Sequence, residues 1–171
     1  MKNAILVVSF VVVLCFALSY QVQATQGMTE QDVKVLVDKG MKIYNTGDVA
    51  LIPEVYAPEV VLHVSGSTEK IIGHEGIKNW VEFVRKAYPD FKIIADETIV
   101  KGDKAVTVWT MTGTNTGPRG TVPPTGKKYS IKAISFSYMK NGKVVKEMTV
   151  YNVLDMMMQL GYTVNPPEVA K

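Results

Sequence analysis

The sequence predicts an α+β domain in which helices pack on one face of a curved antiparallel sheet. In the first half of the chain, apolar residues recur at helical spacing up to Pro89. From Phe91 onwards apolar and polar residues alternate, and short turns separate the alternating segments. Helices followed by hairpin-connected strands are typical of the α+β class. A curved sheet covered by helices encloses an apolar cavity, which is the natural place for a ligand.

Length and composition indicate one exported domain. The chain has 171 residues and 47% hydrophobic content, enough for a single core. Lys2, the apolar run 4–18 and the small residue Ala24 predict a signal peptide over residues 1–24, with an uncleaved anchor as the alternative. We therefore expect a secreted or periplasmic protein, with one domain over residues 25–165 and a flexible tail over 166–171.

The mature chain carries few signs of metal, redox or nucleic-acid chemistry. Its single cysteine, Cys15, lies in the predicted signal peptide, so no disulfide is expected. Loss of Lys2 lowers the net charge from +3 to +2, which is too weak to favour nucleic acid or an anionic membrane. The two histidines, His63 and His74, have no cysteine or carboxylate at ligand spacing, so no metal site is predicted.

Three helices are expected before the main strands. Thr29 is a predicted N-cap, and the helix that follows it ends near Gly47. A short second helix runs from Asp48 to about Tyr56 and contains Pro53, which implies a kink or an early stop. The third and clearest helix ends at Pro89; its apolar stripe is Ile77, Trp80, Val81, Val84, Ala87 and Tyr88.

Five strands and one long loop complete the expected domain. A first strand covers Glu59–Val64, and a long loop over one end of the sheet covers Gly113–Lys128. Lys101-Gly102-Asp103 and Asn141-Gly142 are expected hairpin turns. The four long strands are Phe91–Val100, Lys104–Thr112, Tyr129–Met139 and Lys143–Val153.

The last strand holds the residue on which the functional prediction depends. Met148, Val150 and Asn152 share one face of it, and we expect this apolar row to face the cavity. Tyr151 has the opposite parity and is expected to face away. Asn152 could orient a ligand carbonyl, or it could cap the terminal helix, because asparagine is a favoured N-cap residue.

Five segments in this order resemble the SnoaL-like polyketide cyclase (ester cyclase) family. They are Ala87–Asp90, Gly113–Gly117, Pro123–Gly126, Asn141–Val145 and Gln159–Gly161. The resemblance covers residues 28–161 and implies the cone-shaped α+β fold of the nuclear-transport-factor-2-like superfamily. It also implies closure of a polyketide ring by an intramolecular aldol reaction, without metal or organic cofactor.

The chain departs from the family pattern at two positions that could titrate. Cyclases of the family carry a Trp-x-x-x-Asp pattern on the last strand, where this chain has Met148 and Asn152. Many members have histidine where this chain has Asn115 in the loop. An amide exchanges hydrogen bonds but does not take a proton near neutral pH. The acid/base role is therefore not transferred, whereas the pocket and its polar contacts are.

The candidate site residues follow from the pattern and the resemblance together. His63 and Asn152 are the catalytic candidates, since the unperturbed pKa of histidine lies near neutral pH. A satisfied structural histidine is the alternative for His63, and Asp155 could replace the missing carboxylate if it turns inward. Ser135 and Ser137 are assigned to the polar face of their strand. The expected ligand-binding residues are Trp80, Trp109, Met111, Asn115, Met148 and Asn152.

Three functions remain open from the sequence. The first is a cofactor-free cyclase or isomerase that acts by proton transfer on a small carbonyl-bearing, polyketide-like substrate. The second is a non-catalytic binder of a small apolar or aromatic molecule, and the third is a dimeric interaction module without a ligand. A homodimer is expected from fold analogy alone. A buried titratable group in the cavity would favour catalysis over binding.

Overall fold

The computed structural model describes residues 28–165. The predicted signal peptide and the predicted tail lie outside the described residues. The helices are α2 (Glu30–Thr46), the 3₁₀ turn η1 (Val49–Leu51), α3 (Ile52–Val55), α4 (Gly73–Ala87) and α5 (Val153–Gln159). The strands are β1 (Tyr56–Val64), β2 (Ile71–Ile72), β3 (Lys92–Lys101), β4 (Lys104–Thr114), β5 (Lys128–Lys140) and β6 (Lys143–Tyr151).

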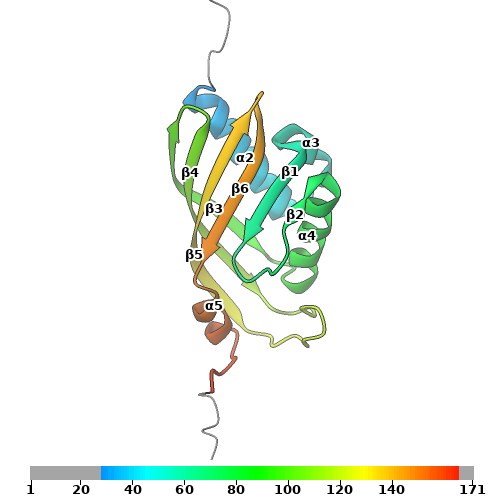
Figure 1. Cartoon of the computed structure of the whole chain (residues 1–171). Helices are drawn as coiled ribbons and strands as arrows, with labels where there is room; N and C mark the ends of the chain where they lie inside the picture. The colour runs from blue at the N-terminus through cyan, green and yellow to red at the C-terminus, as the bar shows by residue number, and fades with distance from the viewer. Residues whose placement is uncertain (1–27, 166–171) are drawn as a thin grey trace, which may run out of the picture.

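The six strands form one sheet in the order β2-β1-β6-β5-β4-β3 (Figure 1). Strands β3 to β6 make the predicted antiparallel meander. The first strand, β1, lies parallel to the last, β6, because the chain leaves β1 through β2 and α4 before it enters the meander at β3. The first and last strands of the chain therefore lie side by side within the sheet.

The helices begin and end where local side chains satisfy the backbone. Thr29 and Asp32 form a capping box at the start of α2, and Gly47 ends this helix in the left-handed conformation. The predicted second helix is broken into η1 and the four-residue α3, which carries Pro53 in its first turn. The N-cap of α5 is Asn152.

The core lies between the sheet and the long helices. Helix α2 packs against β3 and α4 packs against β1 (Figure 1). The predicted apolar stripe of α4 is confirmed, since Ile77, Val81, Val84 and Ala87 are buried. Their burial against the sheet contributes to the hydrophobic stabilisation of this arrangement.

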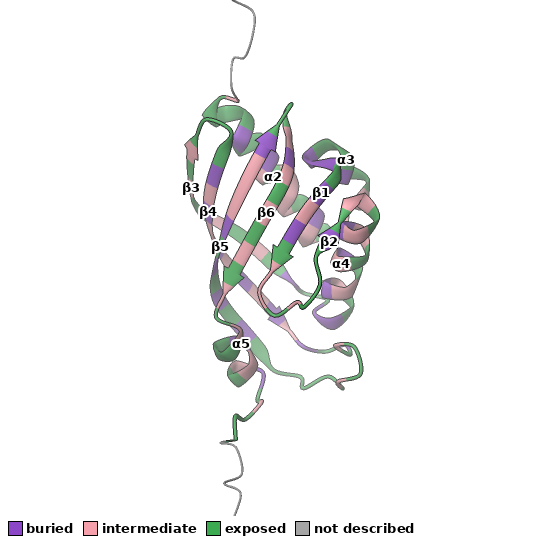
Figure 2. Ribbon diagram, viewed as in Figure 1, coloured by how far each residue is buried: buried purple, intermediate pink, exposed green. Residues whose placement is uncertain are grey.

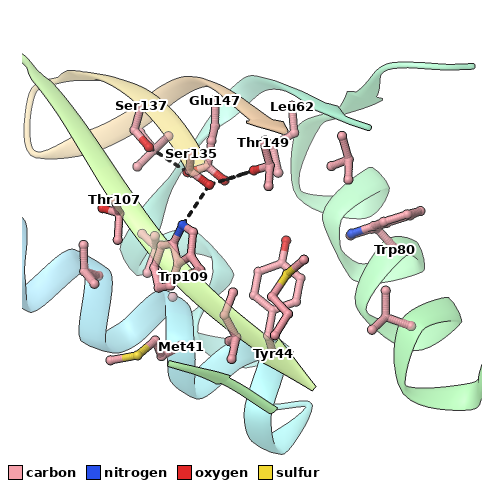
Figure 3. A pocket seen from close by; sticks show the side chains of 18 of the residues that line it. Met41, Tyr44, Leu62, Trp80, Thr107, Trp109, Ser135, Ser137, Glu147 and Thr149 are labelled. Carbon is pink, nitrogen blue, oxygen red and sulfur yellow. Dashed lines mark hydrogen bonds between the residues drawn. The ribbon is translucent and has the colours of Figure 1, made fainter. Parts of the chain in front are cut away.

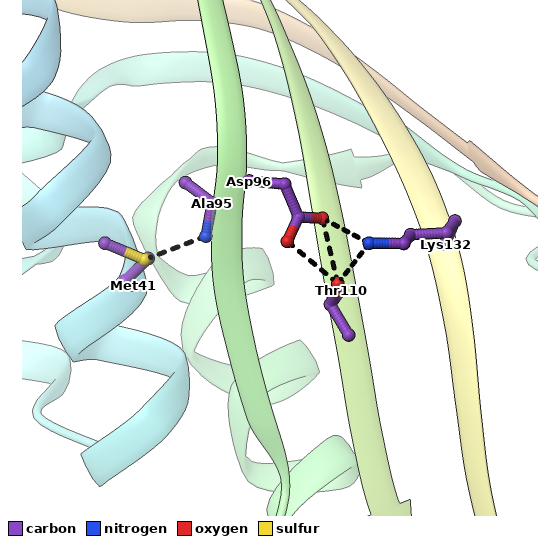
Figure 4. A network of polar contacts seen from close by, with 5 residues as sticks. All are labelled: Met41, Ala95, Asp96, Thr110 and Lys132. Atoms are coloured by element: carbon purple, nitrogen blue, oxygen red, sulfur yellow. Dashed lines mark hydrogen bonds and ion pairs between the residues drawn. The ribbon is translucent and has the colours of Figure 1, made fainter.

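Irregularities in the strand pairing curve the sheet around the helices. The register shifts within the β1–β6, β3–β4 and β5–β6 pairs, and such bulges bend a strand and increase its twist. At the β3 bulge, the Asp96 carboxylate accepts hydrogen bonds from Thr110 and Lys132 (Figure 4). The neighbouring Ala95 N–H points to the Met41 sulfur of α2 at 3.3 Å. The bulge thus joins β3 to the strands on one side and to α2 on the other.

Burial alternates along the strands, as Figure 2 shows. One face of the sheet is covered by the helices, and the other faces outward. Among residues 28–165, no helix is long and apolar enough to cross a membrane.

Candidate functional site

A largely apolar cavity of about 130 Å³ lies between the concave face of the sheet and helices α2, α4 and α5. Trp80 of α4 and Trp109 and Met111 of β4 line it, as expected from the sequence. That these three residues contact a ligand stays a prediction. Because aromatic and aliphatic side chains make most of the wall, the few polar groups inside it decide what the cavity can do.

The face of β6 that borders the cavity is the opposite of the predicted one. Glu147, Thr149 and Tyr151 line the cavity, whereas Met148 and Val150 lie outside it and are 48% and 44% exposed. The predicted inward placement of Met148 and outward placement of Tyr151 are therefore wrong, and the geometry gives no support to a ligand contact of Met148. The apolar row of β6 instead belongs to an exposed apolar stripe on the outer face of the sheet.

Asn152 and Asp155 also lie outside the cavity. Asn152 is exposed, and its side-chain oxygen accepts the Asp155 N–H at 3.0 Å, so it acts as the N-cap of α5. The Asp155 carboxylate accepts a hydrogen bond from Gln159 at the surface. The structural alternative for Asn152 is the one observed, and neither residue supplies a ligand contact or a catalytic group to the cavity.

His63 is placed on the outer face of β1. Its side chain is exposed and pairs in register with Met148 of β6, while Leu62 and Val64 point to the cavity. This placement outside the cavity does not support the predicted role of His63 in catalysis. His74, at the start of α4, has its ring nitrogen 2.8 Å from the Tyr56 carbonyl oxygen, which is a structural contact.

Asn115 is 1% exposed and organises the loop between β4 and β5. Its amide nitrogen donates to the carbonyl oxygens of Ala87 and Gly117, and its amide oxygen accepts the Thr125 N–H. These bonds use both ends of the amide within the protein, and Asn115 does not line the cavity, so the geometry gives no support to the predicted ligand contact. Asn115 instead fastens the loop to the end of α4.

Glu147 is the only carboxylate that lines the cavity within residues 28–165. It stands opposite Ser137 of β5 in the strand register. The Ser137 hydroxyl donates to Glu147 Oε2 over 2.8 Å, and the Thr149 hydroxyl donates to Oε1 over a longer 3.4 Å (Figure 3). These two hydrogen bonds hold the carboxylate in one orientation.

A series of side-chain hydrogen bonds crosses three strands and reaches Glu147. The indole N–H of Trp109 donates to the Ser135 hydroxyl at 3.0 Å, and Ser135 lies 2.8 Å from the Thr149 hydroxyl (Figure 3). Either hydroxyl of the Ser135–Thr149 pair can be the donor. The hydrogen bonds therefore link Trp109 through Ser135 and Thr149 to the Glu147 carboxylate and hold these side chains in place.

The environment of Glu147 favours its neutral form. Burial raises the pKa of the Glu147 carboxyl, and the hydrogen bonds from Ser137 and Thr149 oppose this shift without cancelling it. A carboxyl held closer to neutral pH is a better general base than an ordinary surface carboxylate, because it both accepts and returns a proton readily. Glu147 therefore supplies the titratable group in the cavity that the sequence predicted at His63 or Asp155.

Two tyrosines, Tyr44 of α2 and Tyr56 at the start of β1, also line the cavity. Tyr44 points into the cavity (Figure 3), and its hydroxyl is hydrogen-bonded to that of Tyr56. Burial raises the pKa of Tyr44, and the charge of Glu147 raises it further. The hydroxyl therefore stays protonated and can donate to a ligand oxygen.

A model of the SnoaL-like polyketide cyclase family matches residues 34–160. The chain belongs to this family. Comparison with curated proteins gives no significant match. The predicted family and the cone-shaped nuclear-transport-factor-2-like fold are thus confirmed.

Solved structures of the same fold come from proteins with different assignments. TsrD from Streptomyces laurentii has a TM-score of 0.70 and 24% identity, over 78% of this chain and 98% of TsrD. IdmH from Streptomyces antibioticus, a proposed polyketide cyclase, has a TM-score of 0.64 and 25% identity, over 75% and 98%. AclR from Streptomyces galilaeus, a proposed hydroxylase, has a TM-score of 0.67 and 22% identity, over 82% and 87%. The fold alone does not determine the reaction, which depends on the residues that line the cavity.

Sequence reasoning missed Glu147 and its partners Ser135, Ser137 and Thr149. Alternation along a strand shows which residues share a face, but the usual rule that apolar residues point inward fails here. Three neighbouring strands each carry hydroxyl or carboxyl side chains at positions that pair across the sheet. This pattern is the signal that could have identified these residues.

We expect the contribution of Glu147 to the free energy of unfolding to fall as pH rises. Its folded pKa lies above the ordinary value of 4.5, so ionisation of the folded state is disfavoured relative to the unfolded chain. This contribution to stability is fully present below pH 4.5 and is lost as pH rises through the folded pKa. In Glu147→Gln this pH dependence should disappear, leaving the variant relatively more stable at neutral pH.

Urea unfolding of both proteins at pH 4.5 and pH 7.5 measures the difference. Glu82→Gln, which removes an exposed carboxylate on α4, is the matched control and should behave as the wild type. An equal free-energy gap between wild type and Glu147→Gln at both pH values would show that the Glu147 carboxyl is not perturbed by folding.

Proposed function

We propose that this protein is a proton-transfer enzyme of the cyclase or isomerase type, with Glu147 as its general base and no organic cofactor. The observation that carries the proposal is a single oriented carboxyl group with a raised pKa inside a largely apolar cavity. The substrate class is a small carbonyl-bearing molecule, in keeping with the family. The alternative is a non-catalytic binder of a small apolar ligand.

The reaction begins when the Glu147 carboxylate removes a proton from a carbon next to a carbonyl. The electron pair of the broken C–H bond moves to the carbonyl oxygen and forms an enolate. In a cyclase the enolate carbon then attacks a second carbonyl of the same molecule, forming one C–C bond and an alkoxide. Protonated Glu147 returns its proton to that alkoxide, so the carboxylate is regenerated.

Tyr44 supplies the best-placed donor for the developing oxyanion. Its hydroxyl lines the same cavity as Glu147 and stays protonated because burial raises its pKa. The apolar walls around both groups exclude water, which strengthens the electrostatic stabilisation of an enolate. Glu147 therefore removes the proton while Tyr44 stabilises the oxygen that receives the electron pair.

Deuterium exchange into a simple ketone tests the proposal without knowledge of the natural substrate. 2-Tetralone combines an aromatic ring with acidic hydrogens next to a carbonyl, and proton NMR in D₂O follows the loss of its C1 methylene signal. We expect the protein to accelerate this exchange above the buffer rate with saturation in ketone. Saturable binding of 2-tetralone with no acceleration would support the binder instead.

Export and dimerisation remain separate proposals. We propose cleavage after Ala24, which N-terminal sequencing of the exported protein would test. A homodimer is supported by the exposed apolar stripe on the outer face of the sheet, which includes Ile134, Met148 and Val150. Light scattering of the mature chain measures that association directly.

A further inference from the structure

A second polar group lines the cavity on the side of α5 and the long loop. This group, the arginine end of the cavity, consists of Arg119 and three tyrosines, Tyr88, Tyr129 and Tyr151. Tyr151 and Glu147 lie on the same face of β6, four residues apart, which corresponds to roughly 13 Å along an extended strand. The cavity therefore has two chemically different ends.

Arg119 is held in position by its backbone and lacks an acidic partner. Its N–H and carbonyl group both bond to Val122, which forms a tight turn within the loop that Asn115 fastens. The guanidinium donates to the Met157 sulfur at 3.3 Å, a weak acceptor. Across residues 28–165, no carboxylate lies within ion-pair distance of it. A guanidinium that borders a cavity without a carboxylate retains most of its capacity to bind an anion.

Tyr88 provides an independent observation at the same place. Its side chain is 3% exposed, and its hydroxyl is the one buried side-chain polar atom without a hydrogen-bond partner among the described residues. Its ring is packed edge-on against Tyr129, with ring centroids 5.1 Å apart. An unpartnered buried hydroxyl costs stability, and a ligand oxygen in the cavity would remove that cost.

The arginine end presents donors rather than acceptors. Burial raises the pKa of Tyr88 and of Tyr151, and the charge of Arg119 opposes both shifts. The hydroxyls therefore stay protonated at neutral pH. Asp90, the carboxylate that acts on Tyr129, is itself bound by the Thr114 backbone and hydroxyl. A planar cation beside protonated hydroxyls is suited to a carboxylate, which accepts a bidentate pair and further hydrogen bonds.

We propose that the arginine end binds the carboxylate of an elongated apolar acid, whose opposite end then lies near Glu147. Arg119 supplies the charge and the paired N–H donors, and Tyr88 supplies a third donor. The part of this inference that concerns the reacting carbon rests on the proposed function. Recognition of the carboxylate does not, and it can be measured without turnover.

Binding of 2-naphthaleneacetate and of its neutral amide, followed by calorimetry at pH 7.5, tests the inference. The two probes share one shape and differ in charge. We expect the wild type to bind the acid at least tenfold more tightly than the amide. Arg119→Gln should weaken acid binding about tenfold or more and change amide binding less than twofold, and Arg119→Lys should restore part of the loss.

Tyr88→Phe separates a binding role from a structural one. Removing an unpartnered hydroxyl should leave the unfolding free energy unchanged or higher, while acid binding falls severalfold. Lys101→Gln, which removes an exposed positive charge from the distant β3–β4 turn, is the control and should bind both probes as the wild type does.

Equal affinity of the wild type for acid and amide, or no saturable binding of either, would overturn the inference. So would an Arg119→Gln variant that loses both probes equally, since that points to a disturbed loop. Glu147→Gln should still bind the acid. Its acid binding therefore reports on the arginine end even if the proton-transfer proposal fails.

Discussion

Glu147→Gln is expected to lower the rate of deuterium exchange into 2-tetralone by about 10²- to 10⁴-fold, to a level near the buffer rate. The amide keeps the size of the side chain and can still accept a hydrogen bond from Ser137, but it cannot remove a proton from carbon. The measurement is the exchange rate at saturating ketone, with folding checked by circular dichroism.

The control for this variant is Glu82→Gln on the exposed face of α4, which should exchange at the wild-type rate. Because Glu147→Gln is expected to be at least as stable as the wild type at neutral pH, lost exchange cannot be attributed to unfolding. Retention of more than a tenth of the wild-type rate by Glu147→Gln would remove Glu147 from the role of base.

Ser137→Ala gives a graded test of the same site. Ser137 donates to the Glu147 carboxylate, so its loss should raise the pKa of Glu147 further. The exchange rate as a function of pH should then reach its plateau at higher pH than in the wild type. A residue with a purely structural role would lower the rate without moving this profile.

Gly117→Ala is expected to destabilise the protein by about 3 kcal/mol, which for a domain of this size lowers the melting temperature by roughly 10 °C. A Cβ atom at Gly117 would lie 1.8 Å from the Lys86 carbonyl oxygen, which belongs to the backbone of α4 and has little freedom to move. The loop would have to lift from the helix and break the Asn115 hydrogen bonds to Ala87 and Gly117.

Gly40→Ala is the matched control. Gly40 lies within α2, and a Cβ atom there would meet no other atom within 4 Å. Alanine favours a helix over glycine, so this variant should be more stable than the wild type by about 0.5–1 kcal/mol. Differential scanning calorimetry compares the two. A Gly117→Ala variant that melts within a few degrees of the wild type would show that the loop is not seated on α4.

Much of the fold followed from local patterns in the sequence. The stripe of α4, the N-cap at Thr29 and the alternating strands after Phe91 each predicted an element that the structure contains. These features depend on contacts between residues close in the chain, so periodicity and turn chemistry are sufficient to find them. The pairing of β1 with β6 joins distant segments and was not predicted.

The candidate site was largely misplaced by the same reasoning. Trp80, Trp109 and Met111 were correctly expected at the cavity, because large apolar residues on the inner face of a sheet and helix line any space between them. His63 and Asn152 were expected there and are exposed instead. The chemical type of these two side chains suggested a site, but the polarity of the neighbouring residues did not show which face of the strand borders the cavity.

The sequence by itself determined the family, the fold class and the order of the elements. Tertiary structure decided which face of β6 borders the cavity, and with it the identity of the central residue. The sequence shows which residues of a strand share a face. Which of the two faces points to the cavity depends on what packs on either side of the sheet. Here the apolar row Met148–Val150 lies on the outer face, and the polar row that contains Glu147 faces inward.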